Sequence, residues 1–218
     1  MKNIIVTGCS RGIGLAIAAR LVKKSNVKVI GTSTSGKCEL NAHNFNCLSL
    51  DVSSPKSISD FVSELQGIKI DLLINNAGIL LEDWGDAAVN FQQLRQTFDV
   101  NLFGTIELTE KLLPQMNSEA HIVNITSDWG SFSEQNFDAF QPHYKMSKAA
   151  LNMYTKLLAK RFEHRLIVSA FDPGWTQTDM GGHEASRTPA EVAMDMEQLI
   201  ERVPESGHFW HRGNIREW

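Results

Sequence analysis

The sequence predicts an α/β fold, a single doubly wound parallel sheet with helices on both faces. Two observations predict it. Short apolar runs alternate with longer helical patterns along the chain. Most of these runs are continuously apolar, which is typical of strands buried on both faces. Because 218 residues suit one α/β domain, we expect residues 1–218 to form a single domain.

The elements follow in order along the chain. Strands are expected at 3–7, 27–32, 47–51, 71–75, 121–126 and 166–171. Helices are expected at 12–24, 55–66, 91–116, 143–163 and 189–203. Ser53, with Pro55 just after it, marks the start of the second helix, and Thr188 before Pro189 marks the start of the last one.

Composition narrows the class of protein. Hydrophobic residues make up 42% of the chain and charged residues 21%, which excludes intrinsic disorder. A formal charge of −4 argues against a general nucleic-acid binder, and no apolar run is long enough to span a bilayer. With no signal-peptide pattern before the first strand, Cys9, Cys38 and Cys47 are expected to be reduced thiols of a cytoplasmic protein.

A glycine-rich turn follows the first strand. Gly8, Gly12 and Gly14 lie where a strand turns into a helix. Such glycines permit a tight turn and let the backbone approach a pyrophosphate, and the helix N-terminus offers free N–H groups. A turn without a ligand is the alternative, but its position after the first strand of a parallel pattern favours dinucleotide binding.

Four further motifs follow along the chain, three of them at the expected ends of strands and one at the start of a helix. They are Asp51-Val52, Asn75-Asn76-Ala77-Gly78, Tyr144-x-x-x-Lys148 and Pro173-Gly174-Trp175-Thr176-Gln177-Thr178. With the spacing Gly8-x-x-x-Gly12-x-Gly14, the chain resembles the short-chain dehydrogenase/reductases over nearly its whole length. The resemblance implies a dinucleotide-binding oxidoreductase domain. The cofactor contacts it implies are Gly8, Ser10, Arg11, Gly12, Ile13, Gly14, Thr32, Ser33, Asp51, Val52, Asn76, Ala77, Gly78, Tyr144, Lys148, Pro173, Gly174, Trp175, Thr176 and Thr178.

The turn after the second strand favours NADP(H) over NAD(H). No carboxylate follows that strand until Glu39, whereas an acid there would bind the ribose 2′-hydroxyl of NAD. Arg11 and Lys37 can instead pair with a 2′-phosphate. The alternative is that both are ordinary solvated cations.

The candidate catalytic pair is Tyr144 and Lys148, which share one face of a helix because they are four residues apart. A nearby ammonium, together with the positive charge of oxidised nicotinamide, is expected to lower the phenol pKa and make Tyr144 a usable acid or base. The resemblance adds Ser127, which would hydrogen-bond the substrate oxygen, and Asn101, which would hold a water linking Lys148 to solvent. Alternation along the strand is expected to point Thr126 away.

Two segments depart from the general family pattern. Residues 128–142 carry Trp129 together with Phe132, Phe137 and Phe140, which are expected to line an apolar pocket, make an oligomer contact or pack locally. The lid after Pro173 is short, with Gly181-Gly182 as a candidate hinge. Trp129, Trp175 and Met180 are the candidate pocket residues. These features resemble the subgroup of sniffer-type carbonyl reductases and C-factor-like proteins.

The expected activity is NADP-dependent reduction of small or apolar aldehydes and ketones by hydride transfer, with Tyr144 as the general acid. The alternatives are a dedicated alcohol dehydrogenase or 3-oxoacyl reductase, and a C-factor-like nucleotide-binding signalling protein. The helices at 91–116 and 143–163 resemble those that dimerise family members, so a homodimer is expected. No metal site is expected, because His208 and His211 lack further ligands nearby.

Overall fold

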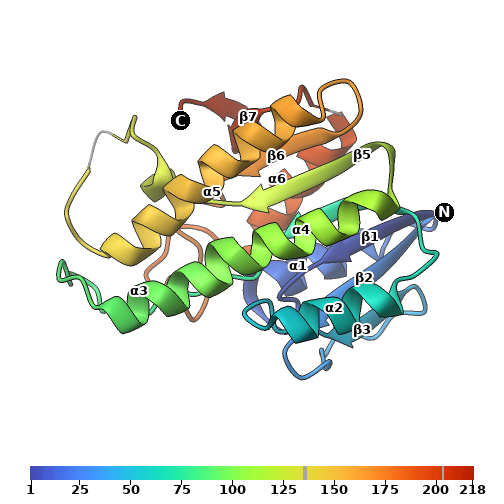
Figure 1. Cartoon of the computed structure of the whole chain (residues 1–218), viewed down its shortest axis with the longest axis horizontal. Helices are drawn as coiled ribbons and strands as arrows, with labels where there is room; N and C mark the ends of the chain where they lie inside the picture. Colours follow the sequence, from blue (N-terminus) through green and yellow to red (C-terminus); the bar gives the residue numbers. More distant parts are fainter. Residues whose placement is uncertain (135–136, 203) are drawn as a thin grey trace.

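The computed structural model describes residues 1–134, 137–202 and 204–218, which build one eight-stranded sheet (Figure 1). The strands lie in the order β3-β2-β1-β4-β5-β6-β7-β8. All neighbouring pairs are parallel except β7 and β8. The strands are β1 Lys2–Val6, β2 Val27–Ser33, β3 Phe45–Ser49, β4 Ile70–Asn75, β5 Met116–Ile125, β6 Ile167–Phe171, β7 His208–His211 and β8 Asn214–Arg216. The predicted doubly wound sheet is confirmed, with one antiparallel strand added at its edge.

Helices cover both faces of the sheet. They are α1 Gly12–Leu21, α2 Pro55–Glu64, α3 Phe91–Phe98, α4 Thr105–Leu112, α5 Pro142–Arg161 and α6 Pro189–Arg202. Alternate side chains of β1 reach opposite layers, since Ile5 belongs to the core under α2, α4 and α5, whereas Val6 belongs to the core under α1 and α6. Figure 1 shows α2, α4 and α5 in front of the sheet and α1 and α6 behind it.

The single helix predicted over 91–116 is wrong in its middle and at its end. Between α3 and α4 the chain forms a π-helical turn, η1 (Asp99–Gly104), and after α4 a 3₁₀ turn, η2 (Leu113–Gln115). Pro114 lacks the N–H that an α-helix would need there, so the helix ends and β5 begins. A Cβ at Gly104 would lie 1.9 Å from the Val52 carbonyl oxygen, so only glycine permits this contact.

Other boundaries differ by a few residues. Helix α1 ends at Leu21 rather than at 24, and β3 spans Phe45–Ser49 rather than 47–51. Ser54, not Ser53, caps α2, because its hydroxyl accepts the Ser57 N–H at 3.3 Å. The predicted last residue of the final helix, 203, lies outside the described residues.

The hairpin of β7 and β8 is absent from the sequence prediction. Its two-residue turn has Arg212 at φ 48° and Gly213 at φ 75°, which is the left-handed geometry that a tight hairpin requires. The strands are only four and three residues long, too short for a clear alternation. Pairing of β7 with β6 brings Arg216 close to the carboxyl end of β6. Every helix in the described part of the chain is too short or too polar to cross a bilayer.

Candidate active site

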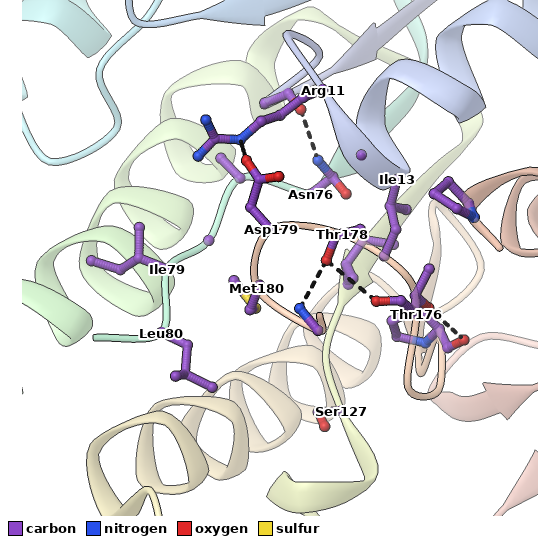
Figure 2. A pocket seen from close by; sticks show the side chains of 18 of the residues that line it. Arg11, Ile13, Asn76, Ile79, Leu80, Ser127, Thr176, Thr178, Asp179 and Met180 are labelled. Carbon is purple, nitrogen blue, oxygen red and sulfur yellow. Dashed lines mark hydrogen bonds and ion pairs between the residues drawn. The ribbon is translucent and has the colours of Figure 1, made fainter. Parts of the chain in front are cut away.

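A cleft of about 1170 Å³ opens at the carboxyl ends of the strands, where the sheet order changes direction between β1 and β4. Its walls come from the glycine turn, from the loops after β3 and β4, from the end of β5, and from the segment after β6. In the view of Figure 2, Arg11 and Asp179 lie at one end and Ser127 lies at the other. The cleft is therefore long enough to bring most of the sequence-predicted residues to one site.

The glycine turn lines the cleft through Gly8, Ser10, Arg11, Gly12 and Ile13. Gly8 and Gly12 have φ values of 69° and 59°, which L side chains rarely adopt. Arg11 is the N-cap of α1, and its side chain makes no capping hydrogen bond. The first N–H groups of α1 are thus left for another acceptor, which fits a pyrophosphate.

Gly14 plays a different role from the one predicted. It is not among the cleft-lining residues, and a Cβ there would lie 2.2 Å from the Gly8 carbonyl oxygen and 2.5 Å from Asn76 Nδ2. Gly14 therefore permits the close packing of α1 on the turn rather than a contact with a ligand.

The loop after β4 clamps the glycine turn. Thr7 Oγ1 accepts the N–H groups of Asn76 and Ala77, both at 2.9 Å, and Asn76 Nδ2 donates to the carbonyls of Thr7 and Gly8 at 2.8 and 3.1 Å. Asn76, Ala77 and Gly78 all line the cleft. Thr7 was missed by the sequence analysis, because a threonine at the end of a strand carries no distinctive signal.

The far end of the cleft is formed by Ser33, Thr34, Asp51 and Val52. Thr32 is buried instead, and its hydroxyl accepts the Gly8 N–H at 3.4 Å, so it supports the turn from behind. Lys37 is not among the residues that line the cleft, which weakens its predicted contact with a 2′-phosphate.

Arg11 reaches across the cleft to the segment after β6. Its Nε lies 3.0 Å from Asp179 Oδ2 (Figure 2). The two side chains are 77% and 73% exposed. Such an exposed ion pair is weak, so Arg11 can exchange this partner for a phosphate.

That segment itself is well ordered by hydrogen bonds. Pro173, Gly174, Trp175, Thr176 and Thr178 line the cleft as predicted. The Thr178 hydroxyl donates to the Thr176 carbonyl at 3.3 Å and accepts the Gly181 N–H at 3.1 Å. A Cβ at Gly181 would lie 2.0 Å from the Thr176 oxygen. Gly181 is therefore a packing glycine, whereas Gly182, with φ 74° and open space around it, remains the candidate hinge of the predicted pair.

Ser127, Tyr144 and Lys148 come together on the wall of the cleft. Ser127 follows β5, while Tyr144 and Lys148 lie in the first two turns of α5. The Lys148 ammonium donates to the Ile125 carbonyl at 3.0 Å and lies 5.4 Å from the centre of the Tyr144 ring. Burial lowers the pKa of Lys148 from 10.5 to about 8.

The expected lowering of the Tyr144 pKa is wrong for the protein by itself. Burial raises the pKa of the phenol, and the charges of Asp172, Asp128 and Glu82 raise it further, whereas a hydrogen bond with Ser127 opposes them. Desolvation thus outweighs the nearby ammonium. Tyr144 holds its proton firmly.

Asn101 lies behind the cleft in the π-helical turn, fully buried. Its amide accepts the Ile79 N–H at 2.8 Å and donates to the Ile79 carbonyl at 2.9 Å and to Ser147 Oγ at 3.1 Å. A Cβ at Gly78 would lie 3.3 Å from Asn101 Oδ1 and 3.6 Å from Lys148 Nζ. Both groups therefore face the small space that glycine leaves open, as a bridging water would require.

The aromatic segment divides. Trp129 lines the cleft, as do Trp175 and Met180. Phe132, Phe137 and Phe140 do not, and they are 91%, 65% and 44% exposed, so the pocket interpretation is wrong for these three. Residues 135 and 136 lie outside the described part of this segment. Thr126 borders the cleft, but it is fully buried and its hydroxyl is covered, so it presents no polar atom to a ligand.

Two buried charge clusters were missed by the sequence analysis. Glu82 Oε1 accepts the N–H groups of His143 and Tyr144 at 2.7 and 3.1 Å, and lies 3.0 Å from His143 Nδ1. It thereby fixes the start of the helix that carries Tyr144. Its signal is weak, because an acid in a polar loop is usually solvated.

The second cluster surrounds Asp172, which is 1% exposed at the end of β6. Arg216 and His211 contact its Oδ2 at 2.6 and 3.0 Å, and the Gly174 N–H donates to Oδ1 at 2.8 Å. Burial alone would raise the pKa of Asp172, but these partners hold it below its usual value. In sequence the three residues are too far apart to suggest a cluster.

Together, the sheet topology, the uncapped helix at the glycine turn and the cleft define a dinucleotide-binding α/β protein. The comparisons make this specific. The sequence model of the short chain dehydrogenase family matches residues 2–188, so this chain belongs to that family of oxidoreductases. The resemblance stated from the sequence is confirmed.

Individual relatives agree. C-signal of Myxococcus xanthus is 34% identical over 157 residues, which cover 68% of this chain and 93% of that protein. Human retinol dehydrogenase 13 is 29% identical over 205 residues, covering 84% of this chain and only 61% of that longer protein.

Among solved structures, an NADPH-bound carbonyl reductase from chicken fatty liver superposes with a TM-score of 0.89 at 27% identity, covering 100% of this chain and 94% of that one. The carbonyl reductase Sniffer of D. melanogaster gives a TM-score of 0.89 at 25% identity, covering both chains completely.

Proposed function

We propose that this protein uses NADPH to reduce the carbonyl group of small or apolar aldehydes and ketones. The observation that carries the proposal is the arrangement of one cleft, with the uncapped glycine turn and Arg11 along one part and Ser127, Tyr144 and Lys148 along another. The similarity to NADPH-bound carbonyl reductase supports the same cofactor here. The cofactor-contact residues named from the sequence remain part of this proposal, apart from Gly14 and Thr32, which support the turn from behind.

The chain's own residues would act as follows. NADPH, when bound, supplies the hydride. Tyr144 gives its proton to the carbonyl oxygen, and the Ser127 hydroxyl orients that oxygen and stabilises its developing charge. Lys148 holds a positive charge near the phenolate that remains, and Asn101 with Gly78 leaves room for a water that returns a proton. Carbonyl reduction requires the protonated phenol, which is the form that burial favours.

The second candidate is a nucleotide-binding signalling role, favoured by the similarity to C-signal. The two candidates differ in what they require of Tyr144. Binding needs the glycine turn, whereas catalysis also needs the phenol.

The chain offers a matched pair of variants, because Tyr144 and Tyr154 are its two tyrosines and both lie on α5. The Tyr154 hydroxyl contacts Glu110 at 3.0 Å, away from the cleft. With NADPH and a panel of aldehydes and ketones, we expect Tyr144→Phe to lose at least about a hundredfold in kcat/KM. Tyr154→Phe should keep its rate. Both should bind NADPH as the unmodified protein does. If Tyr144→Phe and Tyr154→Phe both keep their rate, or if neither variant nor the unmodified protein reduces any of the carbonyl compounds, the reductase proposal is contradicted.

We also propose a cytoplasmic homodimer that acts as one domain per chain. Exposed apolar side chains on and beside the central helices support the dimer, among them Phe103, Met153 and Leu157 at 57%, 59% and 62% exposure. A monomeric mass by light scattering at micromolar concentration contradicts it.

A further inference from the structure

Three tryptophans from three different loops meet along one wall of the cleft. Trp84 comes from the loop after β4, Trp129 from the turn after β5, and Trp175 from the segment after β6. The ring centre of Trp84 lies 5.7 Å from that of Trp129 and 6.2 Å from that of Trp175. Trp129 in turn meets Tyr144 edge-on at 6.0 Å. We call Trp84, Trp129 and Trp175 the tryptophan wall.

The wall is held in place but only partly covered. Trp175 Nε1 donates to the Gly181 carbonyl at 2.7 Å. The Trp129 N–H donates to Ser127 Oγ and Asp128 Oδ1, at 3.2 and 2.9 Å. Trp84 and Trp175 nevertheless remain 58% and 49% exposed. Large apolar rings that are left exposed inside a cleft indicate a surface for an apolar ligand.

The charges around the wall select between two kinds of ligand. Aromatic walls bind cations or flat neutral rings. Here Lys145 already lies 5.1 Å from the centre of the Trp129 ring, and Lys148 lies 5.4 Å from that of Tyr144. The Trp129 ring therefore already has a cation beside it, which is held there by its ion pair with Asp138. A cationic ligand would have to displace Lys145 from that ring, whereas a neutral flat ring can pack beside it in edge-to-face or offset geometry.

We propose that the tryptophan wall recognises a neutral aromatic ring attached at or next to the carbonyl group, so that aryl aldehydes and aryl ketones are the preferred substrates. This inference rests on the proposed reductase function, since it places the reacting oxygen at Tyr144. The contact of Trp129 with Tyr144 sets the distance, because a ring against Trp129 lies close to the proton donor. Trp84, which the sequence analysis did not single out, is the specificity-determining residue.

The test compares rings of equal size and different shape. The measured quantity is the ratio of kcat/KM for benzaldehyde to that for cyclohexanecarbaldehyde, with NADPH, in four proteins. We expect a ratio of roughly ten in the unmodified protein, the effect of about one aromatic contact pair. Trp84→Phe should keep the ratio, and Trp84→Leu, which keeps an apolar side chain but no ring, should lower it to about three or less. Phe132→Ala removes an aromatic ring outside the cleft and should leave it unchanged.

Three other results would overturn the assignment of the tryptophan wall to an aromatic ligand. A ratio near one in the unmodified protein, or a ratio that Trp84→Leu does not change, overturns the aromatic assignment. Faster reduction of betaine aldehyde, a quaternary ammonium aldehyde, than of benzaldehyde also overturns it, in favour of a cation site.

A calorimetric titration separates this inference from the proposed function. Benzyl alcohol and cyclohexylmethanol are titrated into the protein with NADP⁺. Aryl-selective binding that Trp84→Leu abolishes, without turnover of any carbonyl, upholds the tryptophan wall and overturns the reductase. Turnover without aryl selectivity upholds the reductase and overturns the wall.

Discussion

Lys148 is a charged side chain that the fold buries at a cost in stability, and its replacement by methionine tests this directly. The side chain is 4% exposed, and burial lowers its pKa from 10.5 to about 8. While the amine is charged in both the folded and the unfolded chain, this shift corresponds to about 3 kcal/mol of lost stability. Methionine has a similar length and no charge, so Lys148→Met removes that cost together with the ammonium near Tyr144.

The pH dependence has a definite sign. The cost is fully present below pH 8, where both states are charged, and it disappears as the pH rises through 10.5, where the unfolded chain loses its proton too. At pH 9.5 about 1.4 kcal/mol of it remains. Methionine also leaves the Ile125 carbonyl without its Lys148 donor, at a cost of about 1–2 kcal/mol that does not depend on pH. At pH 7 the free energy of unfolding of Lys148→Met should therefore be about 1–2 kcal/mol higher than that of the unmodified protein.

The assay is urea unfolding of both proteins at pH 7 and pH 9.5, with carbonyl reduction measured in parallel. The free energy of unfolding of Lys148→Met minus that of the unmodified protein should fall by about 2 kcal/mol from pH 7 to pH 9.5. The variant should also have lost its carbonyl reductase activity. Lys156→Met, on the exposed side of the same helix, serves as the control and should show no pH-dependent difference. A difference between the unmodified protein and Lys148→Met that stays constant from pH 7 to pH 9.5 refutes a buried ammonium with a lowered pKa.

Two further predictions concern charge. Arg11→Ala should weaken NADPH binding by about tenfold or more while leaving NADH binding nearly unchanged. Asp179→Asn, which frees Arg11 from its ion pair, should tighten NADPH binding by about two- to threefold. Fluorescence titration measures both effects, and equal losses of NADPH and NADH binding in Arg11→Ala would exclude a contact between Arg11 and the 2′-phosphate. Burial lowers the pKa of His121 to about 3, so the folded state loses stability as the pH falls below 6.5, the pKa of the histidine in the unfolded chain. His121→Gln should therefore lose about 2 kcal/mol less stability than the unmodified protein between pH 6.5 and pH 5. Urea unfolding measures this, and an equal decrease in the free energy of unfolding of the two proteins over that pH range would contradict the prediction.

The fold was predictable because burial on both faces leaves a clear trace in sequence. The runs Ile4-Ile5-Val6 and Leu72-Leu73-Ile74 are uninterrupted by polar residues, and the strands β1 and β4 form where these runs lie. The glycine turn and the Tyr144–Lys148 spacing were predictable for the same reason, since backbone conformation and helix periodicity act over a few residues.

What the sequence did not predict depends on contacts between distant segments. The Asp172 cluster requires that β8 returns beside β6, and the tryptophan wall requires that three loops converge. The π-helical turn at Asp99–Gly104 depends on the packing of Gly104 against Val52, about fifty positions away. For the protein without its cofactor, the shift of the Tyr144 pKa has the opposite sign to the predicted one, because spacing reveals a nearby lysine but not the extent of burial.

The charges around Tyr144 explain why burial and chemistry are coupled at this site. Burial and the charges of Asp172, Asp128 and Glu82 raise the pKa of the phenol, so that it stays protonated but is a weaker acid. The same carboxylates would oppose the phenolate that forms after proton transfer. Arg216 and His211 neutralise Asp172, and the Lys148 ammonium, kept charged below about pH 8, faces the ring. The Lys148 ammonium therefore offsets part of the opposition to the phenolate, and it does so at the expense of being buried.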